Sequence, residues 1–289
     1  MAFTREHVRH PLVLRRLYVS AVHRVVPNIV RVTLTGSELA GFASTGPADH
    51  LKAFFPDPTT GILTLPEVGP DGIRRGAEGV VISRDYTPRA FRPTAHGGGH
   101  GGEHGGEHGG EHGELDLDIV THGVDGPASA WAELAQVGDD LAVAGPRGSR
   151  LVPEGVETLL IVADETALPA TGRWLELLPA TVPVTALLYV ADESVESYFD
   201  PAIATRMDAE WITHADGHLQ LEESLRSLGR IGDATFVFLA GEADILVPLR
   251  RYLRHELGLP AEQVSASGYW RRGVVNLDHH APLDPSDPD

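Results

Sequence analysis

The chain has 289 residues, of which 42% are hydrophobic, so it is long enough for two domains that each bury a core. Its formal net charge of −18 argues against a nucleic-acid partner, because phosphate binding depends on clustered Lys and Arg side chains. Cysteine is absent, which excludes disulfides, thiolate zinc sites and all-cysteine iron–sulfur clusters in this chain.

No apolar run approaches the length of about 18 residues that a membrane helix needs. Arg15 and Arg16 interrupt the apolar stretch over 11–20, and no apolar export region follows this arginine pair. We therefore expect a cytoplasmic protein that neither crosses a membrane nor binds nucleic acid.

The first half of the chain has the pattern of short strands separated by turns that contain glycine or proline. Apolar residues predict strands over 17–26, 29–35, 51–55, 62–65, 80–86 and 115–121. Short strands of this kind favour a closed antiparallel barrel. We expect a β-barrel domain over residues 1–150.

The predicted strand over 80–86 ends in the motif Arg84-Asp85-Tyr86-Thr87. A guanidinium can neutralise a pyrophosphate, a phenol ring can lie against a flat aromatic ring system, and a threonine hydroxyl can reach a ring nitrogen. These groups suit a flavin nucleotide. A motif this short also occurs by chance, and an edge strand with an exposed tyrosine is the alternative.

Residues 96–113 form a low-complexity insertion rich in glycine. Histidines recur in it every four residues, at His96, His100, His104, His108 and His112. The glycine pairs make a helix costly, at about 1 kcal/mol per glycine, so we expect a disordered segment. Imidazoles at this density would chelate Zn²⁺, Ni²⁺ or Cu²⁺. A tolerated loop expansion and a metal sensor or buffer both remain open.

Pro127 suits the first turn of a helix, which we predict over 128–137. The first N–H groups of this helix, at Ala128 and Ser129, would point at an anion such as a pyrophosphate. The Ser129 hydroxyl could add a hydrogen bond, although a serine is also an ordinary residue at a helix start.

The second half changes to strands that alternate with helices. Apolar patterns predict strands over 158–163, 182–190 and 234–240 and helices over 167–178 and 246–257. This alternation implies a parallel sheet in an α/β domain over 151–289, with the boundary near Arg150. Asp164-Glu165-Thr166 and Gly241-Glu242 would lie at the carboxyl ends of strands, where such sheets bind ligands. No Gly-x-Gly-x-x-Gly fingerprint follows a strand here.

These motifs resemble the siderophore-interacting protein family, the flavin-dependent ferric-siderophore reductases of the ferredoxin-reductase superfamily. The similarity runs from Leu17 through Tyr86 and His122 to Arg272-Gly273. Its most specific blocks are Asp164-Glu165-Thr166-Ala167-Leu168-Pro169 and Gly268-Tyr269-Trp270. The insertion and the tails lie outside it.

The resemblance implies an N-terminal antiparallel Greek-key barrel that binds FAD and a C-terminal parallel-sheet domain similar to NAD(P)H-binding domains. It places Arg84 on the flavin phosphate, Tyr86 against the ring and Thr87 near the reactive edge. The other cofactor residues that it implies are Asp118, Val120, His122, Ala128, Ser129, Thr166, Tyr269 and Trp270.

The activity implied by the resemblance is reduction of a ferric siderophore to release Fe(II), with NADPH, NADH or reduced ferredoxin as the electron donor. Lys52 is the only lysine among 23 basic residues, and the resemblance places it with Arg147 and Arg272 in a basic set that binds an anionic siderophore. A general NAD(P)H-dependent flavin or ferric reductase and a His-rich metal-binding or storage protein remain alternatives.

Overall fold

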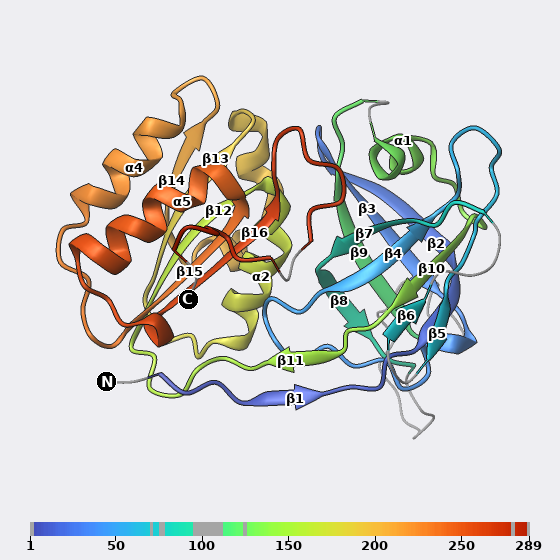
Figure 1. Ribbon diagram of the computed structural model, residues 1–289, viewed down its shortest axis with the longest axis horizontal. Helices are drawn as coiled ribbons and strands as arrows, with labels where there is room; N and C mark the ends of the chain where they lie inside the picture. The colour runs from blue at the N-terminus through green and yellow to red at the C-terminus, as the bar shows by residue number, and fades with distance from the viewer. Residues whose placement is uncertain are drawn as a thin grey trace. The chain divides into compact units, whose positions relative to one another are not determined.

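The fold is taken from a computed structural model, which describes residues 3–69, 72–74, 79–94, 112–123, 126–278 and 281–287. The chain divides into two compact units (Figure 1). Residues 9–45 and 49–149 form the first, which we call the barrel unit, and residues 1–8, 46–48 and 150–289 form the second, the parallel-sheet unit. The boundary passes through β1 (His7–Arg9) and β11 (Gly148–Arg150), which pair in a separate two-stranded sheet.

The barrel unit is built on a seven-stranded antiparallel sheet with the order β7-β4-β10-β2-β3-β9-β8. Its strands are β2 (Leu14–Val26), β3 (Ile29–Thr35), β4 (Leu51–Phe55), β7 (Ile82–Tyr86), β8 (Pro88–Arg92), β9 (Glu114–Val120) and β10 (Asp140–Ala144). The two edge strands, β7 and β8, follow each other directly in the chain through Thr87. The sheet must therefore curl until its edges meet.

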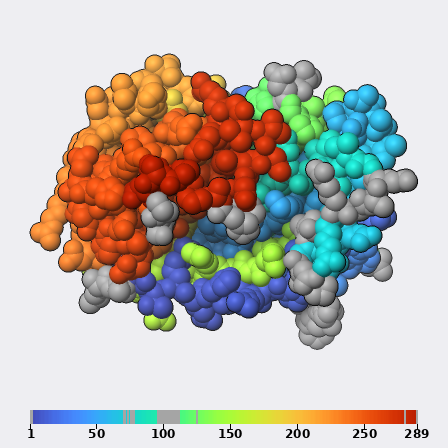
Figure 2. Space-filling model, viewed as in Figure 1, coloured from blue at the N-terminus to red at the C-terminus, as the bar shows by residue number. Residues whose placement is uncertain are grey.

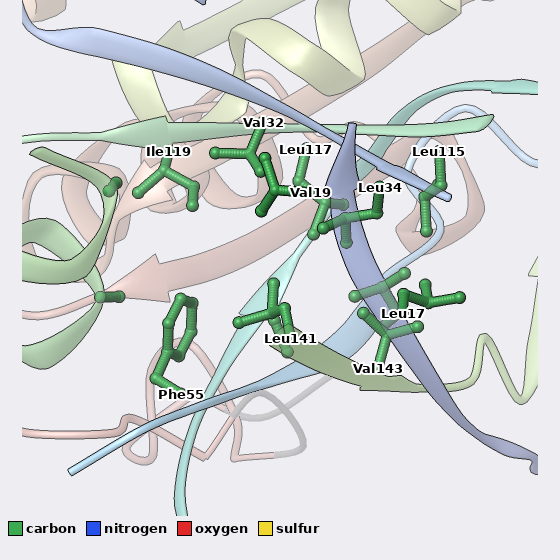
Figure 3. Close-up of a cluster of buried hydrophobic side chains, with 14 of the residues drawn as sticks. Leu17, Val19, Val32, Leu34, Phe55, Leu115, Leu117, Ile119, Leu141 and Val143 are labelled. Carbon is green, nitrogen blue, oxygen red and sulfur yellow. The ribbon is translucent and has the colours of Figure 1, made fainter. Parts of the chain in front are cut away.

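Alternate residues of these strands point inward and form one apolar core, because successive side chains of a strand lie on opposite faces. Leu17, Val32, Leu117 and Leu141 are all at most 2% exposed, and their side chains converge in Figure 3. Helix α1 (Pro127–Leu134) adds Ala128, Ala132 and Trp131 to the same core. The remaining elements of this unit are the 3₁₀ turn η1 (Ser37–Leu39) and the ribbon of β5 (Glu67–Gly69) and β6 (Gly72–Arg74).

The parallel-sheet unit has five strands, all parallel, in the order β14-β13-β12-β15-β16. They are β12 (Thr158–Asp164), β13 (Val184–Val190), β14 (Asp208–Thr213), β15 (Thr235–Glu242) and β16 (Val264–Trp270). The first strand lies in the centre, so the order reverses between β12 and β15. That point is where open α/β sheets gather ligands, at the carboxyl ends of their strands.

Helices cover the faces of this sheet, as the apolar strands require. They are α2 (Leu168–Leu177), α3 (Pro201–Ala204), α4 (His218–Ser227) and α5 (Ala243–Arg251), with short turns η2 (Glu165–Ala167), η3 (Glu193–Tyr198) and η5 (Ala261–Gln263) and the π-helical η4 (Tyr252–Glu256). In Figure 2 atoms in the orange to red colours of α4, α5 and the C-terminal residues form much of the visible surface of this unit. Leu221 and Leu225 of α4 and Leu246 and Leu249 of α5 belong to the same core cluster as residues of the strands. No helix among the described residues has the length and apolar character to span a bilayer.

The predicted fold class, an antiparallel barrel-type sheet followed by a parallel α/β sheet, is confirmed. The strand predicted over 62–65 is wrong: a turn bonds Gly61 N to Asp57 O, and the following residues join no ladder. Leu63 and Leu65 instead pack beside Phe54. The predicted helices also end early, since α1 stops at Leu134 and α5 gives way to the π-helical turn. In the two main sheets, strands β8, β10, β14 and β16 were not predicted, and neither were helices α3 and α4.

Candidate functional site

The motif at the end of β7 presents polar groups that have few partners. The Arg84 guanidinium donates to the carbonyl of the adjacent Ser83 at 2.7 Å, and within the described residues it has no carboxylate partner. The Tyr86 and Thr87 hydroxyls likewise have no hydrogen-bond partner there, although Thr87 is only 7% exposed. A strand end with an unmatched cation and two unmatched hydroxyls is suited to a polar, anionic ligand.

The register of β7 against β4 decides which way these side chains point. Tyr86 pairs with Leu51 and Arg84 with Ala53, so both face the side of the sheet that carries the core. The Tyr86 ring is half buried and meets the Phe55 ring edge-on at 6.0 Å between centroids. Burial raises the pKa of the Tyr86 phenol, and the Arg84 charge only partly opposes this, so the phenol stays protonated at physiological pH.

The end of β9 lies beside this motif. The ladder between β8 and β9 ends where Pro88 pairs with Leu117, which places Thr87 next to Asp118 and the residues that follow it. Asp118 points away from the core and accepts two hydrogen bonds from Arg31, at 2.7 and 2.8 Å. Its carboxylate is thus already neutralised by Arg31.

Helix α1 begins close to the same strand ends. Its residue Trp131 contacts Phe55, the ring that also meets Tyr86. The Ser129 hydroxyl accepts from the backbone N–H of His122 at 2.9 Å and donates to the carbonyl of Gly123 at 2.6 Å. This hydroxyl therefore holds the loop between β9 and α1, which leaves the backbone N–H groups of the first helical turn for an anion.

Lys52 lies at this end of β4 but on the opposite face of the sheet. It pairs with Asp85 in the register, and its Nζ contacts both carboxylate oxygens at 2.9 Å. The two side chains are 29% and 19% exposed. The lysine of the predicted substrate site thus carries its own counter-ion. Arg147 is exposed, and its side chain has no partner among the described residues.

In the parallel-sheet unit, Asp164 brings three of the predicted blocks together. One carboxylate oxygen accepts from the Thr166 N–H at 2.9 Å and from the Thr166 hydroxyl at 2.5 Å. The other accepts from the Glu242 N–H at 2.8 Å and from the Trp270 indole N–H at 2.7 Å. Thr166 and Trp270 are therefore fixed by hydrogen bonds within their own unit, and Trp270 keeps 36% of its surface exposed.

Glu165, Tyr189 and His214 complete this strand-end cluster and were not among the predicted site residues. The Glu165 carboxylate accepts from the Ala191 N–H and lies 3.9 Å from the His214 ring, which packs on Tyr189. Burial and the adjacent Asp164 charge raise the pKa of Glu165 to about 7. The signal for Glu165 was its place directly after an apolar run, whereas His214 follows a strand that the sequence did not reveal.

The residues described contain no group of three or more His, Cys, Asp or Glu side chains arranged to hold a metal ion. Of the five tract histidines only His112 belongs to them; His96, His100, His104 and His108 lie outside the described residues. His112 and Gly113 are joined to the barrel through their carbonyls, which accept from the Thr35 hydroxyl.

Comparisons with known proteins match the two halves of the chain separately. The family "Siderophore-interacting FAD-binding domain" matches residues 18–150, and the family "Siderophore-interacting protein" matches residues 156–273. A crystal structure of a siderophore utilization protein from T. fusca has a TM-score of 0.82 and 37% identity and covers 96% of this chain and 100% of that one.

Two relatives with named activities cover nearly the whole chain. The NADPH-dependent ferric-chelate reductase of Escherichia coli is 35% identical over 92% of this chain and 96% of its own length. The ferric vibriobactin reductase ViuB of Vibrio cholerae is 30% identical over 92% and 90%. The two halves thus define a two-unit protein whose first unit is a FAD-binding domain. The chain belongs to the siderophore-interacting protein family.

Proposed function

We propose that this protein reduces ferric siderophores through a bound FAD and so releases Fe(II) in iron acquisition. The observation that carries the proposal is the end of the barrel, where Arg84, Tyr86 and Thr87 present unmatched polar groups beside the first turn of α1. Relatives that are named as ferric reductases and align over at least nine tenths of both chains support the reaction.

The residues at this end of the barrel fit FAD. Arg84 and the N–H groups of Ala128 and Ser129 would bind the pyrophosphate, which needs positive charge and backbone donors. Tyr86 would lie against the flavin ring and Thr87 would donate to its edge. When bound, FAD supplies two-electron chemistry with a nicotinamide and one-electron transfer to iron. The protein contributes position and charge neutralisation, and no covalent attack by a side chain is needed.

NADPH or NADH is the proposed donor, and the name of the Escherichia coli relative favours NADPH. Reduced ferredoxin is the other donor that we propose to test. A cytoplasmic location is part of the proposal, because a chain without cysteine has no disulfide that would need an oxidising compartment.

The first experiment is an absorption spectrum of the protein purified from cells supplied with riboflavin. We expect a bound yellow flavin, followed by anaerobic reduction in stopped flow by NADPH, NADH or reduced ferredoxin and by Fe(II) release from a ferric siderophore. A colourless protein that does not quench FAD fluorescence in a titration would remove the proposal. Flavin reduction without Fe(II) release would instead indicate a general flavin reductase.

Lys52 stays a proposed siderophore contact, with Arg147 and Arg272 as further cations of the substrate site. A protein of charge −18 repels a ferric catecholate unless a local cation attracts it. Because Asp85 neutralises Lys52, Asp85→Asn should lower KM for an anionic ferric siderophore, while Lys52→Ala should raise it about two- to fivefold and flatten its salt dependence. Unchanged KM in both FAD-loaded variants would exclude Lys52 from the site.

A further inference from the structure

Side-chain carboxylates accept hydrogen bonds from backbone N–H groups at the carboxyl edge of the parallel sheet. Asp164 accepts from the N–H groups of Thr166 and Glu242, at 2.9 and 2.8 Å. Glu242 in turn accepts from the N–H groups of Ile245 and Arg272, at 2.8 and 3.0 Å. The Ala191 N–H donates to the Glu165 carboxylate in the same way. Backbone N–H groups at the carboxyl ends of four of the five strands are therefore hydrogen-bonded to side chains of the chain itself.

The packing at this edge leaves no room between the sheet and the Asp164 carboxylate. A Cβ atom built on Gly241 would lie 2.6 Å from Cγ of Asp164, and Gly241 has φ of 146°. The close approach of this backbone serves an internal carboxylate. In dinucleotide-binding sheets a glycine at a strand end lets the backbone approach the pyrophosphate of the ligand.

These donors lie at the point where a doubly wound sheet ordinarily holds a dinucleotide. The strand order reverses between β12 and β15, and Asp164 and Glu242 are the last residues of those two strands. In open α/β folds the N–H groups at this point bind the pyrophosphate. Here the N–H groups of Thr166 and Glu242 already donate to the Asp164 carboxylate.

Charge at the edge acts in the same direction. Asp192 and Asp216 stand at the same edge as Asp164, Glu165 and Glu242, and Arg272 and His214 are the basic groups facing them. Burial raises the pKa of Asp164 and of Glu165, which favours their neutral forms. The charge that a pyrophosphate would meet there therefore comes from Asp192, Asp216 and Glu242, against the one permanent cation, Arg272.

We infer that the carboxyl groups of Asp164, Glu165 and Glu242, by accepting these N–H hydrogen bonds, exclude the pyrophosphate of a dinucleotide from the reversal point of the sheet. They are specificity-determining residues for the electron donor, and this rests on the proposed function in that the donor is a nicotinamide nucleotide. Such a donor is then held without the strand-end N–H groups, so its affinity does not depend on a phosphate cradle at this edge.

The first test uses the wild-type protein loaded with FAD, so that the flavin site is filled. Isothermal titration with inorganic pyrophosphate and with ADP should give no saturable binding at millimolar concentration, and neither should compete with NADPH. Saturable micromolar binding of pyrophosphate or ADP to this FAD-loaded protein would overturn the inference. Failure of the protein to bind FAD is a separate result, which would count against the proposed function alone.

The second test removes the internal anion. Asp164→Ala leaves the Thr166 N–H and hydroxyl, the Glu242 N–H and the Trp270 indole without an acceptor. Formate or phosphate should then bind in place of the carboxylate and raise Tm by about 3–6 °C for each tenfold increase in anion above its Kd. The wild type should not respond.

Asp216→Ala is the matched control, because Asp216 also accepts a backbone N–H at this edge, from Thr213 at 2.8 Å, but is exposed to solvent. Its Tm should not respond to formate. A folded Asp164→Ala protein that ignores both anions would overturn the inference. If that variant does not fold, the wild-type titration decides the question.

Discussion

Two strand ends in this protein carry similar polar groups and use them in opposite ways. At the end of β7 the Arg84 guanidinium and the hydroxyls of Tyr86 and Thr87 have almost no partners within the described residues. At the end of β12 every oxygen of Asp164 is engaged, with four donors between them. The polar groups at the end of β7 are available to a ligand, whereas the donors at the end of β12 are already bonded to a carboxylate of the chain itself.

The difference shows that a motif at a strand end does not by itself define a binding site. What distinguishes the two ends is whether the polar groups find partners inside the same unit, because a buried donor that is already bonded gains little from a ligand. The barrel end combines unmatched charge with partial exposure. At the carboxyl edge of the parallel sheet the donors are already hydrogen-bonded, and the acidic side chains Asp164, Glu165 and Glu242 are buried.

The largest expected effect comes from disrupting the packing around Asp164 at the end of β12. Gly241→Ala would place a Cβ 2.6 Å from the Asp164 carboxyl carbon and force a residue with a side chain to adopt φ of 146°. We expect the free energy of unfolding of the parallel-sheet unit to fall by about 3–5 kcal/mol. Urea unfolding followed by tryptophan fluorescence measures it.

Gly229→Ala is the control for this loss, since Gly229 also has positive φ, 66°, but nothing lies within 4 Å of its added Cβ. The left-handed conformation alone costs about 1–2 kcal/mol. Equal losses in the two variants would show that close approach to Asp164 is not the cause.

The ionisation of Glu165, next to the end of β12, can be measured as a dependence of the free energy of unfolding on pH. The pKa of Glu165 rises from 4.5 to about 7 on folding, so the folded state binds the proton more tightly. The free energy of unfolding should therefore fall as pH rises from about 4.5 to 7, by up to about 3 kcal/mol from this group. The lowered pKa of His214 acts in the opposite direction.

Glu165→Gln isolates the contribution of the carboxyl group. The difference in unfolding free energy between this variant and the wild type should change over that pH window, whereas the exposed Glu262→Gln should give a flat difference. A flat difference for Glu165→Gln would mean that the carboxyl group ionises normally.

Arg84→Ala tests the end of β7, because it removes the guanidinium that has no carboxylate partner within the described residues. Losing a charge-assisted hydrogen bond to the FAD phosphate should cost about 1.5–3 kcal/mol, which is about a 10- to 150-fold increase in Kd. Quenching of FAD fluorescence in the apoprotein measures Kd. Arg84→Lys keeps the charge without the planar fork and should fall between, and Arg24→Ala, which removes an exposed pair with Glu133, should leave Kd unchanged.

The smallest expected effect comes from shortening the insertion. Deletion of residues 97–111 should change the free energy of unfolding by less than about 0.6 kcal/mol and leave FAD binding intact, because loop-closure entropy varies slowly with length. His112 and Gly113 are kept, since the Thr35 hydroxyl bonds to both. Loss of retention on a Ni²⁺ column should be the main change. A deletion protein that holds FAD but no longer reduces iron would place the tract in the reaction.

The sequence predicted the two fold classes because their signals are local. Apolar runs mark β12 and β15, and the Arg84-Asp85-Tyr86-Thr87 motif marks the end of β7. Strand β14 was missed because Asp208–Thr213 contains charged residues and only half of its positions are apolar. An exposed edge strand lacks the continuous apolar run that identifies a buried one.

The partners of the site residues could not be predicted in the same way. The pairing of Lys52 with Asp85 follows from the register of β4 against β7, and that of Asp164 with Glu242 joins residues 78 positions apart. Register and long-range contacts depend on the whole sheet. The sequence therefore indicated which residues carry charge but not which charges are already neutralised.

The position of the insertion keeps it away from the candidate cofactor residues of β9. It joins β8 to β9 at the Glu114 end, whereas His122 lies beyond the other end of β9, about 25 Å away along the strand. The tract repeats a four-residue unit, so gain or loss of whole units changes the number of histidines but none of the residues paired in the β8–β9 register. We therefore expect variants that differ in histidine number to keep the same barrel.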